Sequence, residues 1–416
     1  MSSLGMVLDI ATSALAAQQH AIDVTAHNIA NVDTEGYSRQ IPSLQAKQAV
    51  LHQGMILGRG VEIEQVARSI DQFIENKLMQ EKSNLSSFQE MEKYMQVLEA
   101  MFSESSDASM SATLSDFWNL WHDISNNPSG SSERIALYEH SLLMSEQFQS
   151  LIPDLNQIQT DITNAITVGI ERINQITSEI SQINVEIVGM EANNNVANDL
   201  RDKRNALVSE LNEYLDIKTF EQSSHSLTIV AAKGCTLVHN DRNYELEIYG
   251  DRVKWQDSGG NYVDITNHIS NGKIGGWLEL RDEIIAKYEL DLDAMAKEFI
   301  WSVNQQHSQG VGLEGFNTVT GSYSVTNSGA AITASGLFYQ DKVDDNNKDF
   351  KIWLFDTNGV PYDADSGTAG LQGNPITITV TSGMTVDQLV AAIDGETGIQ
   401  ASLDSNNRIT ISINTT

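Results

Sequence analysis

Residues 4–40 constrain the fold of this chain more than any other stretch. Large apolar side chains recur there at every seventh position, and a row of smaller ones accompanies them: Leu8, Leu15, Ile22 and Ile29, with Val7, Ala14 and Ala21. A seven-residue apolar repeat keeps one seam of a helix facing a partner helix, as in a coiled coil. We therefore predict a helix whose seam needs a partner elsewhere in the protein or on another subunit. Residues 28–40, rich in Asn, Asp and Gly, should end this helix in a turn.

The following segments predict a short strand pair and then a series of helices. Residues 50–66 alternate apolar residues with glycines, whereas residues 68–103 carry an apolar stripe on a seven-residue spacing. Residues 114–124 form a short aromatic helix, and we expect Trp118 and Trp121 in its core. Residues 155–190 alternate apolar steps of three and four, which is typical of a long coiled-coil helix. The asparagines at 193–195 should break it, and Asn198 or Asp199 should cap the next helix.

From residue 219 the apolar period becomes two, which predicts short strands joined by Asn, Asp and Gly turns. The only cysteine, Cys235, falls in one of these strands and should be a small buried apolar residue. We expect Gly275-Gly276-Trp277 to end this β region and residues 277–308 to return to helix. The last unit, residues 321–416, combines alternating strands with a short helix over 385–393.

These patterns together predict an α+β, elongated multidomain fold. A long coiled-coil-like helical trunk would be built from non-contiguous segments, and antiparallel β domains would lie outside it. The predicted divisions, in order, are residues 1–66 for the N-terminal assembly helix and a short extended segment, 67–220 for the helical trunk, 221–276 for a β subdomain, 277–315 for a helix that returns to the trunk, and 321–416 for an outer β-rich domain.

The composition excludes several classes of partner. The formal net charge of -31 repels nucleic acid phosphates and anionic lipids, so we expect neither a nucleic acid nor a membrane as a partner. The sequence contains no run of about 18 apolar residues, so we predict no membrane span. The start of the chain lacks the basic region of a cleaved signal peptide. The protein is therefore expected in the cytosol, or outside the cell by a route without a cleaved signal.

The motifs that resemble catalytic or binding sites lack the context that such sites require. Residues 310–315 match the dinucleotide fingerprint as letters, but a helix rather than a strand precedes them. The acidic run at 344–349 lacks the glycine and the glutamate of a calcium loop. The histidines are scattered, and no Cys/His cluster is present. We therefore expect no catalytic residue, no cofactor and no metal site.

Several stretches resemble bacterial flagellar axial proteins (the rod, hook and hook-associated proteins). Residues 13–19 and 28–37 are similar to the N-terminal signature of these proteins, and Gly36-Tyr37-Ser38-Arg39-Gln40 is more similar to the family of the first hook-associated protein, FlgK. Residues 197–204 and 276–315 agree with the same family. Residues 384–413 resemble a small repeat of flagellins and hook-associated proteins. The family normally ends in an amphipathic helix that pairs with the N-terminal one, and no such helix is seen here. Either the sequence is truncated or its N-terminal helix has lost its usual mate, and we expect truncation because the sequence stops within a predicted strand.

This resemblance implies a structural, non-enzymatic protein that forms a ring at the junction between hook and filament. The implied partners are further copies of itself, the hook protein, a second junction protein of the HAP3 type and an export chaperone. The implied location is the extracellular flagellum, reached by type III export. The residues expected to mediate subunit assembly are Leu8, Leu15, Ile22 and Ile29 of the seam and Asn28, Asn31, Gly36, Tyr37 and Arg39 of the turn. The alternatives are an intramolecular core helix for these residues, and a secreted adhesin or a coiled-coil signalling protein for the whole chain.

Overall fold

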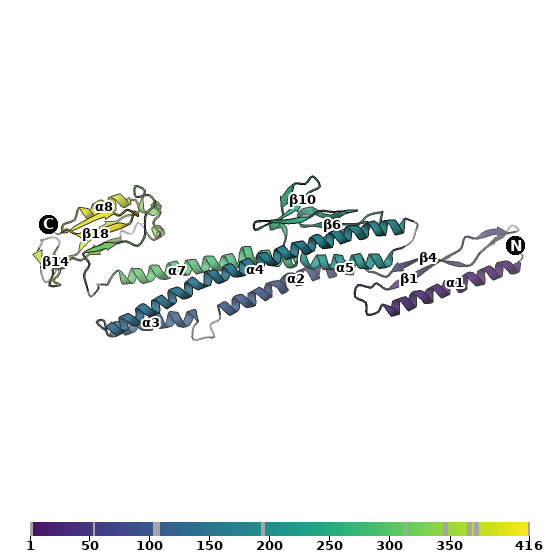
Figure 1. The fold of residues 1–416 in the computed structure, drawn as a ribbon, viewed down its shortest axis with the longest axis horizontal. Helices are drawn as coiled ribbons and strands as arrows, with labels where there is room; N and C mark the ends of the chain where they lie inside the picture. The colour runs from purple at the N-terminus through teal and green to yellow at the C-terminus, as the bar shows by residue number, and fades with distance from the viewer. Residues whose placement is uncertain are drawn as a thin grey trace. The chain divides into compact units, whose positions relative to one another are not determined.

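The computed structural model describes residues 3–52, 55–102, 109–192, 196–310, 312, 314–343, 348–363, 368–369 and 374–414. The chain divides into two units, Met1–Asp293 and Ala294–Thr416. Helix α7 (Ala286–His307) contains the boundary between them. Figure 1 labels the main helices and strands of both units.

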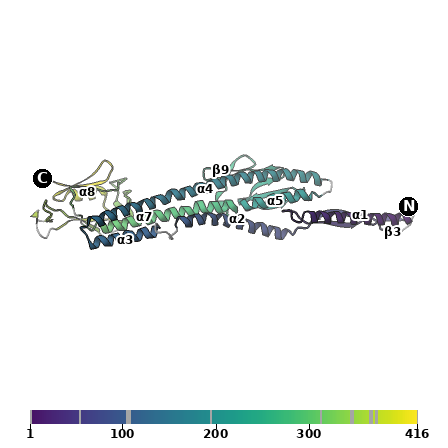
Figure 2. The same cartoon turned by 60° about the horizontal axis from the view of Figure 1, so that its bottom comes forward.

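The first unit begins with what we call the N-terminal module, residues 3–68. Helix α1 (Ser3–Ala30) lies along a β-hairpin of β1 (Gln40–Ala46) and β4 (Val61–Arg68), which is extended by β2 (Val50–His52) and β3 (Met55–Leu57) (Figures 1 and 2). The helix turns small residues, Ser13 and Ala17, toward the hairpin and buries them. Gly60, at φ +96°, approaches so closely that a Cβ there would lie 2.2 Å from Ser13 Oγ. The large apolar seam of α1 therefore faces away from the hairpin.

The trunk consists of helices that are far apart in the sequence. Helices α2 (Gln72–Met101), α4 (Ser131–Glu191), α5 (Asn198–Tyr214) and α6 (Gly272–Glu279) pack together, and α3 (Met110–Asn126) pairs with α4. The 61 residues of α4 give it a length of about 90 Å at the usual rise per residue. Its buried face carries Ile162, Ile173, Ile176, Ile180 and Ile187, which belong to the same hydrophobic core as Leu207, Leu211 and Leu215 of the α5 region. The predicted trunk of non-contiguous segments is thus confirmed.

Helix α2 approaches α6 through small residues. Ser83, Ser86 and Ser87 are buried, and a Cβ on Gly276 would lie 2.7 Å from the Ser87 carbonyl oxygen. Most of the larger apolar residues between positions 73 and 88 of α2 point elsewhere and are exposed: Phe73, Ile74, Leu78, Leu85 and Phe88. Helix α6 continues through a π-helical turn, Leu280–Ile285, into α7.

The β subdomain inserted between α5 and α6 contains two antiparallel sheets. Strands β5 (Lys218–Glu221), β6 (Leu227–Ala231), β7 (Cys235–His239) and β8 (Arg242–Asn243) form one in that order, and β11 (Tyr262–Asp264), β10 (Arg252–Gln256) and β9 (Leu246–Tyr249) form the other. Ile229, Leu237 and Val253 join the core cluster of α4. Cys235 is buried, as predicted, and burial raises the pKa of its thiol.

The second unit begins within α7 and is mainly antiparallel. Its sheets have the orders β12 (Thr318–Thr320), β18 (Ile409–Ile413), β17 (Ile399–Leu403); β13 (Lys348–Ile352), β16 (Ile376–Val380); and β14 (Tyr362–Asp363), β15 (Thr368–Ala369). Helix α8 (Val386–Asp394) begins with a capping box of Thr385 and Gln388, close to its expected position. The core gathers Ile376, Ile378, Ile393, Ile399 and Ala401.

Three local expectations were wrong. Gly275-Gly276-Trp277 does not end the β region but lies inside α6, where the two glycines permit close contact with neighbouring backbone. Helix α5 is not capped by Asn198 or Asp199, since the cap position is Ala197 and the Asn198 side chain instead donates to the Val66 carbonyl at 2.8 Å. Trp118 is 52% exposed, because α3 turns Phe117 rather than Trp118 inward.

Other expectations remain open. The break at 193–195 and the acidic turn at 344–347 lie outside the described residues, as do residues 311 and 313 of the glycine-rich stretch. The five-part division of the chain at residues 66, 220, 276 and 315 stays a prediction.

Candidate functional site

The seam predicted on α1 is an exposed face of the helix. Leu8, Leu15, Ile22 and Ile29 are 66%, 72%, 67% and 69% exposed, and Val7 and Val32 beside them are open to a similar degree. The seven-residue spacing places the four seam residues on one side of α1, opposite the small residues that contact the hairpin. Large contiguous apolar patches on protein surfaces often mark interaction sites.

The turn after α1 is closed by side chains that the sequence had suggested for assembly. Asn28 Nδ2 donates to the Gln40 carbonyl at 2.9 Å, and Asn28 Oδ1 accepts from the Gln40 amide and the Tyr37 hydroxyl, both at 2.8 Å. Asn31 Nδ2 donates to the His27 carbonyl at 3.0 Å. In this chain, therefore, the side chains of Asn28, Asn31 and Tyr37 stabilise the turn through hydrogen bonds.

Gly36 and Arg39 occupy different places in the same turn. Gly36 adopts φ +78°, and a Cβ there would lie 3.4 Å from the Cβ of Ala206 in α5, so the turn lies close to the trunk. Arg39 is exposed, and its backbone carbonyl accepts a hydrogen bond from the Ser69 amide at 2.8 Å. The structure thus brings the four seam residues onto one face of α1, while Asn28, Asn31 and Tyr37 form hydrogen bonds within α1 and the turn.

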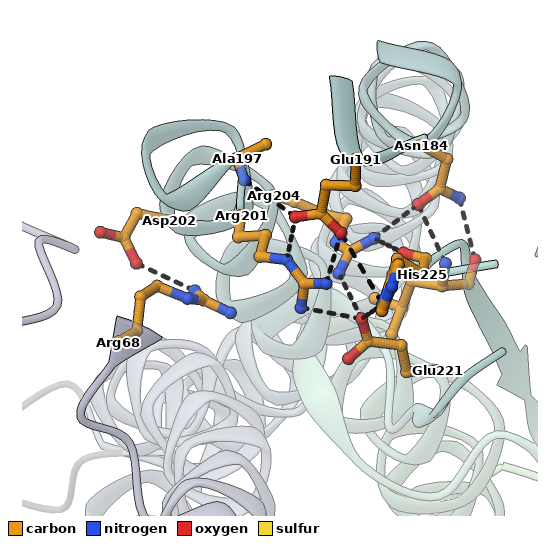
Figure 3. A network of polar contacts seen from close by, with 10 residues as sticks. Arg68, Asn184, Glu191, Ala197, Arg201, Asp202, Arg204, Glu221 and His225 are labelled. Atoms are coloured by element: carbon orange, nitrogen blue, oxygen red, sulfur yellow. Dashed lines mark hydrogen bonds and ion pairs between the residues drawn. The ribbon is translucent and has the colours of Figure 1, made fainter. Parts of the chain in front are cut away.

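The N-terminal module meets α5 through polar groups. Asp202 Oδ1 accepts from Arg68 Nη1 at 2.9 Å, and Asp202 Oδ2 accepts from the Ser38 amide at 3.0 Å (Figure 3 shows the ion pair). The side chains of Arg68 and Asp202 are only 11% and 9% exposed. Asp199, one turn earlier, accepts from Gln40 Nε2 at 3.3 Å. Burial, reinforced by Asp199 and Asp202, raises the pKa of the Tyr37 hydroxyl.

A second polar network, also in Figure 3, fastens the β subdomain to the trunk. Arg201 forms a bidentate pair with Glu191, with distances of 2.8 and 2.7 Å, and contacts Glu221 at 2.8 Å. Burial of Glu191 opposes its charge, but hydrogen bonds from Arg201 and from the Ala197 amide outweigh this and lower its pKa. Because Glu191 ends α4 and Glu221 belongs to β5, Arg201 ties three elements together.

Arg204 and Asn184 continue this network into the core. Arg204 Nη1 donates to Asn184 Oδ1 at 3.0 Å and to the His225 carbonyl at 2.9 Å. Burial lowers the pKa of Arg204 to about 10. The side chain of Asn184 also accepts from the Leu227 amide at 3.0 Å and donates to the Leu227 carbonyl at 2.9 Å. It thus makes, at the start of β6, the two hydrogen bonds that a neighbouring strand would make. Sequence reasoning had assigned residues 197–204 a helix start and a resemblance to a family, but no contacts with the rest of the chain.

The described residues offer little that would support catalysis or metal binding. A polar depression in the first unit is lined by residues that include Asp251, Arg252, Arg281 and Asp282, but Arg281 is already bound to Asp282 and to the Asp251 carbonyl. Within the described ranges, no group of three or more His, Cys, Asp or Glu residues could hold a metal ion. Among the helices searched there, none is both long and apolar enough to cross a lipid bilayer.

A long helical trunk with an exposed apolar face is typical of structural proteins, and the comparisons give the chain a structural role in the bacterial flagellum. The flagella basal body rod protein family matches residues 8–37, which contain the seam, and the flagellin hook IN motif matches residues 366–415. The flagellar hook-associated protein FlgK helical domain matches residues 95–322. The chain therefore belongs to the FlgK family of flagellar hook-associated proteins, which confirms the resemblance seen in the sequence.

Curated relatives agree with this assignment. Flagellar hook-associated protein 1 of Bacillus subtilis is 26% identical to this chain over an aligned length of 442 residues. The alignment covers 96% of this chain and 86% of the relative. The proteins of the same name from Salmonella typhimurium and Escherichia coli are each 27% identical over 76% of this chain, which spans 58% and 59% of their lengths. The flagellar hook junction protein FlgK from Burkholderia pseudomallei has a similar fold, with a TM-score of 0.52 and 16% identity over 81% of this chain and 62% of that one.

Proposed function

We propose that this chain forms the junction between hook and filament by axial self-assembly through the seam of α1. The observation that carries the proposal is the exposure of Leu8, Leu15, Ile22 and Ile29 on a chain of the FlgK family. The implied partners are further copies of this chain in a ring, the hook protein, a second junction protein of the HAP3 type and, before export, a chaperone. The protein would act outside the cell, in the flagellum, after export without a cleaved signal peptide, and would have no enzymatic activity.

The energetics of the seam favour a polymer over an isolated pair. Burying a Leu or Ile side chain contributes about 1.5–3 kcal/mol, so four that are roughly two-thirds exposed offer about 4–8 kcal/mol in all. Association itself costs an estimated 4–15 kcal/mol. One seam contact would therefore be weak, whereas a ring in which each copy meets several neighbours would be stable. A subunit with such a seam would stay monomeric in solution until it adds to the end of a growing assembly.

The test replaces two central seam residues, Leu15→Gln and Ile22→Gln, in the full chain. Because these residues are 72% and 67% exposed, the free energy of unfolding should change by no more than about 0.5 kcal/mol for each. Binding to isolated hooks, followed by electron microscopy and sedimentation, should weaken at least about 30-fold, which corresponds to about 2 kcal/mol of lost burial.

Val168→Gln is the matched control, since Val168 is 65% exposed but lies on α4 in the trunk. This variant should bind hooks like the unmodified chain. The proposal fails if the seam variant caps hooks normally. It also fails if the seam variant unfolds as easily as a core variant, because the seam would then be an intramolecular core.

A further inference from the structure

The joint between the N-terminal module and the trunk is made of polar contacts. As far as the described residues show, the large hydrophobic cluster of the trunk and β subdomain draws no side chain from residues 3–68. The polar contacts that cross the joint include the bonds of Asp202 to Arg68 and Ser38, of Asp199 to Gln40, and of Asn198 to the Val66 carbonyl, and His27 Nε2 lies 3.9 Å from Asp199 Oδ1. A polar joint differs physically from an apolar one, because water can replace its hydrogen bonds as soon as the two sides separate.

Asp202 holds the module at two separate points. Arg68 is the last residue of β4, whereas Ser38 lies in the turn that follows α1, and each binds a different oxygen of the same carboxylate. The chain itself connects the module to α2 only through residues 69–71, which belong to neither β4 nor α2. Among the residues that the structure describes, the Asp202 carboxylate of α5 is the group that binds both arms of the module at hydrogen-bond distance.

We infer that Asp202 is a positioning residue that docks the N-terminal module on the trunk, and that residues 69–71 act as a pivot when its two bonds are broken. The role given to this docking rests on the proposed function. The orientation of the module sets the direction of the α1 seam, and this direction decides how a neighbouring copy can bind to the seam. Every hydrogen bond across the joint acts only at short range, so a displacement of the module that breaks the two bonds of the carboxylate breaks those of Asp199 and Asn198 as well. The joint thus behaves as docked or free, while the trunk keeps its own core in either state.

The variants separate the two bonds. Asp202→Ala removes both, whereas Asp202→Asn keeps one acceptor oxygen for the Ser38 amide but places its amide nitrogen opposite Arg68, so that the ion pair and its hydrogen bond are lost. The matched control is Glu210→Ala on the same helix, because Glu210 forms a bidentate pair with Arg172 at 2.7 and 2.9 Å inside the trunk. All variants are made in the full chain and studied as monomers in solution.

Two measurements report the joint directly. The first is the distance distribution between spin labels at Gln18→Cys on α1 and Val188→Cys on α4, both exposed positions; the buried Cys235 is replaced by serine. The second is hydrogen exchange over residues 28–40, which contain the Ser38 amide. We expect Asp202→Ala to broaden the distances and to speed exchange of that amide at least about tenfold, as for the loss of one net hydrogen bond. Asp202→Asn should fall between it and the unmodified chain, and Glu210→Ala should match the unmodified chain.

Two results would overturn the inference. One is an unchanged distance distribution in both Asp202 variants, which would mean that the carboxylate does not hold the module. The other is loss of trunk structure together with the module, seen as a melting temperature of Asp202→Asn well below that of Glu210→Ala, which would make Asp202 a stability residue. The seam variants Leu15→Gln and Ile22→Gln should keep the docked distance even if they fail to bind hooks, so the joint and the proposed function are tested separately.

Discussion

Replacing Gly276 by alanine tests the close approach of α6 to α2. The added Cβ would lie 2.7 Å from the Ser87 carbonyl oxygen and 2.9 Å from Ser87 Oγ. The hydroxyl can rotate away, but the carbonyl oxygen belongs to the backbone of α2 and moves only with the helix. The substitution should therefore push the two helices apart along a contact that buries Ser83, Ser86 and Ser87.

The magnitude follows from two opposing effects. Alanine in place of glycine inside a helix gains up to about 1 kcal/mol from backbone entropy. Overpacking a dense core costs about 1–3 kcal/mol, and the upper end applies here because backbone must move. We expect Gly276→Ala to lower the free energy of unfolding by about 2 kcal/mol. Gly189→Ala isolates the first effect, since nothing lies within 4 Å of a Cβ on Gly189 in α4, and it should stabilise the trunk by about 0.5–1 kcal/mol.

Urea unfolding followed by far-ultraviolet circular dichroism measures both variants against the unmodified chain, since most of the helical signal comes from the trunk. The difference between the two variants is the informative quantity, because the entropy gain is common to both and largely cancels. A difference near 3 kcal/mol supports the contact as described. If Gly276→Ala is as stable as Gly189→Ala, the reasoning is refuted, since α2 and α6 would then have room for a methyl group.

Two further substitutions test the polar network that holds the β subdomain. Glu191→Gln should cost about 3 kcal/mol, because it breaks a buried ion pair although Arg201 keeps Glu221. Since the folded-state pKa of Glu191 is lowered, its charge stabilises the fold above the unfolded-state pKa and ceases to do so as the pH falls through the folded-state pKa. Acid titration of stability should therefore be shallower in Glu191→Gln, and an unchanged profile would contradict the assignment. Asn184→Ala leaves both backbone groups of Leu227 without their partner and should cost about 1–3 kcal/mol, with faster hydrogen exchange in β6 as the readout; normal protection there would contradict the role given to Asn184.

Local pattern was enough to predict most of the elements and the seam. The isoleucine repeat of α4 specified both a long helix and its buried face, because period and burial agree along its length. Alternation predicted the strands around Ile229 and Leu237, and Thr385 marked the start of α8. The seven-residue repeat also identified Leu8, Leu15, Ile22 and Ile29 as sharing one side of α1. These features depend on neighbours a few residues apart, and the sequence contains that information directly.

The direction in which a face points was not contained in the same pattern. Helix α1 and residues 73–88 of α2 turn serine, alanine or other small residues inward and most of their large apolar residues outward, and periodicity alone does not say which side of a helix faces the rest of the chain. The reason is that packing depends on which distant segments meet. Arg68 and Asp202 are 134 residues apart, and Ser87 meets Gly276 across an even longer separation. Contacts of this kind arise only when the whole chain has folded, so the joint at Asp202 and the glycine contact of α6 became visible only in three dimensions.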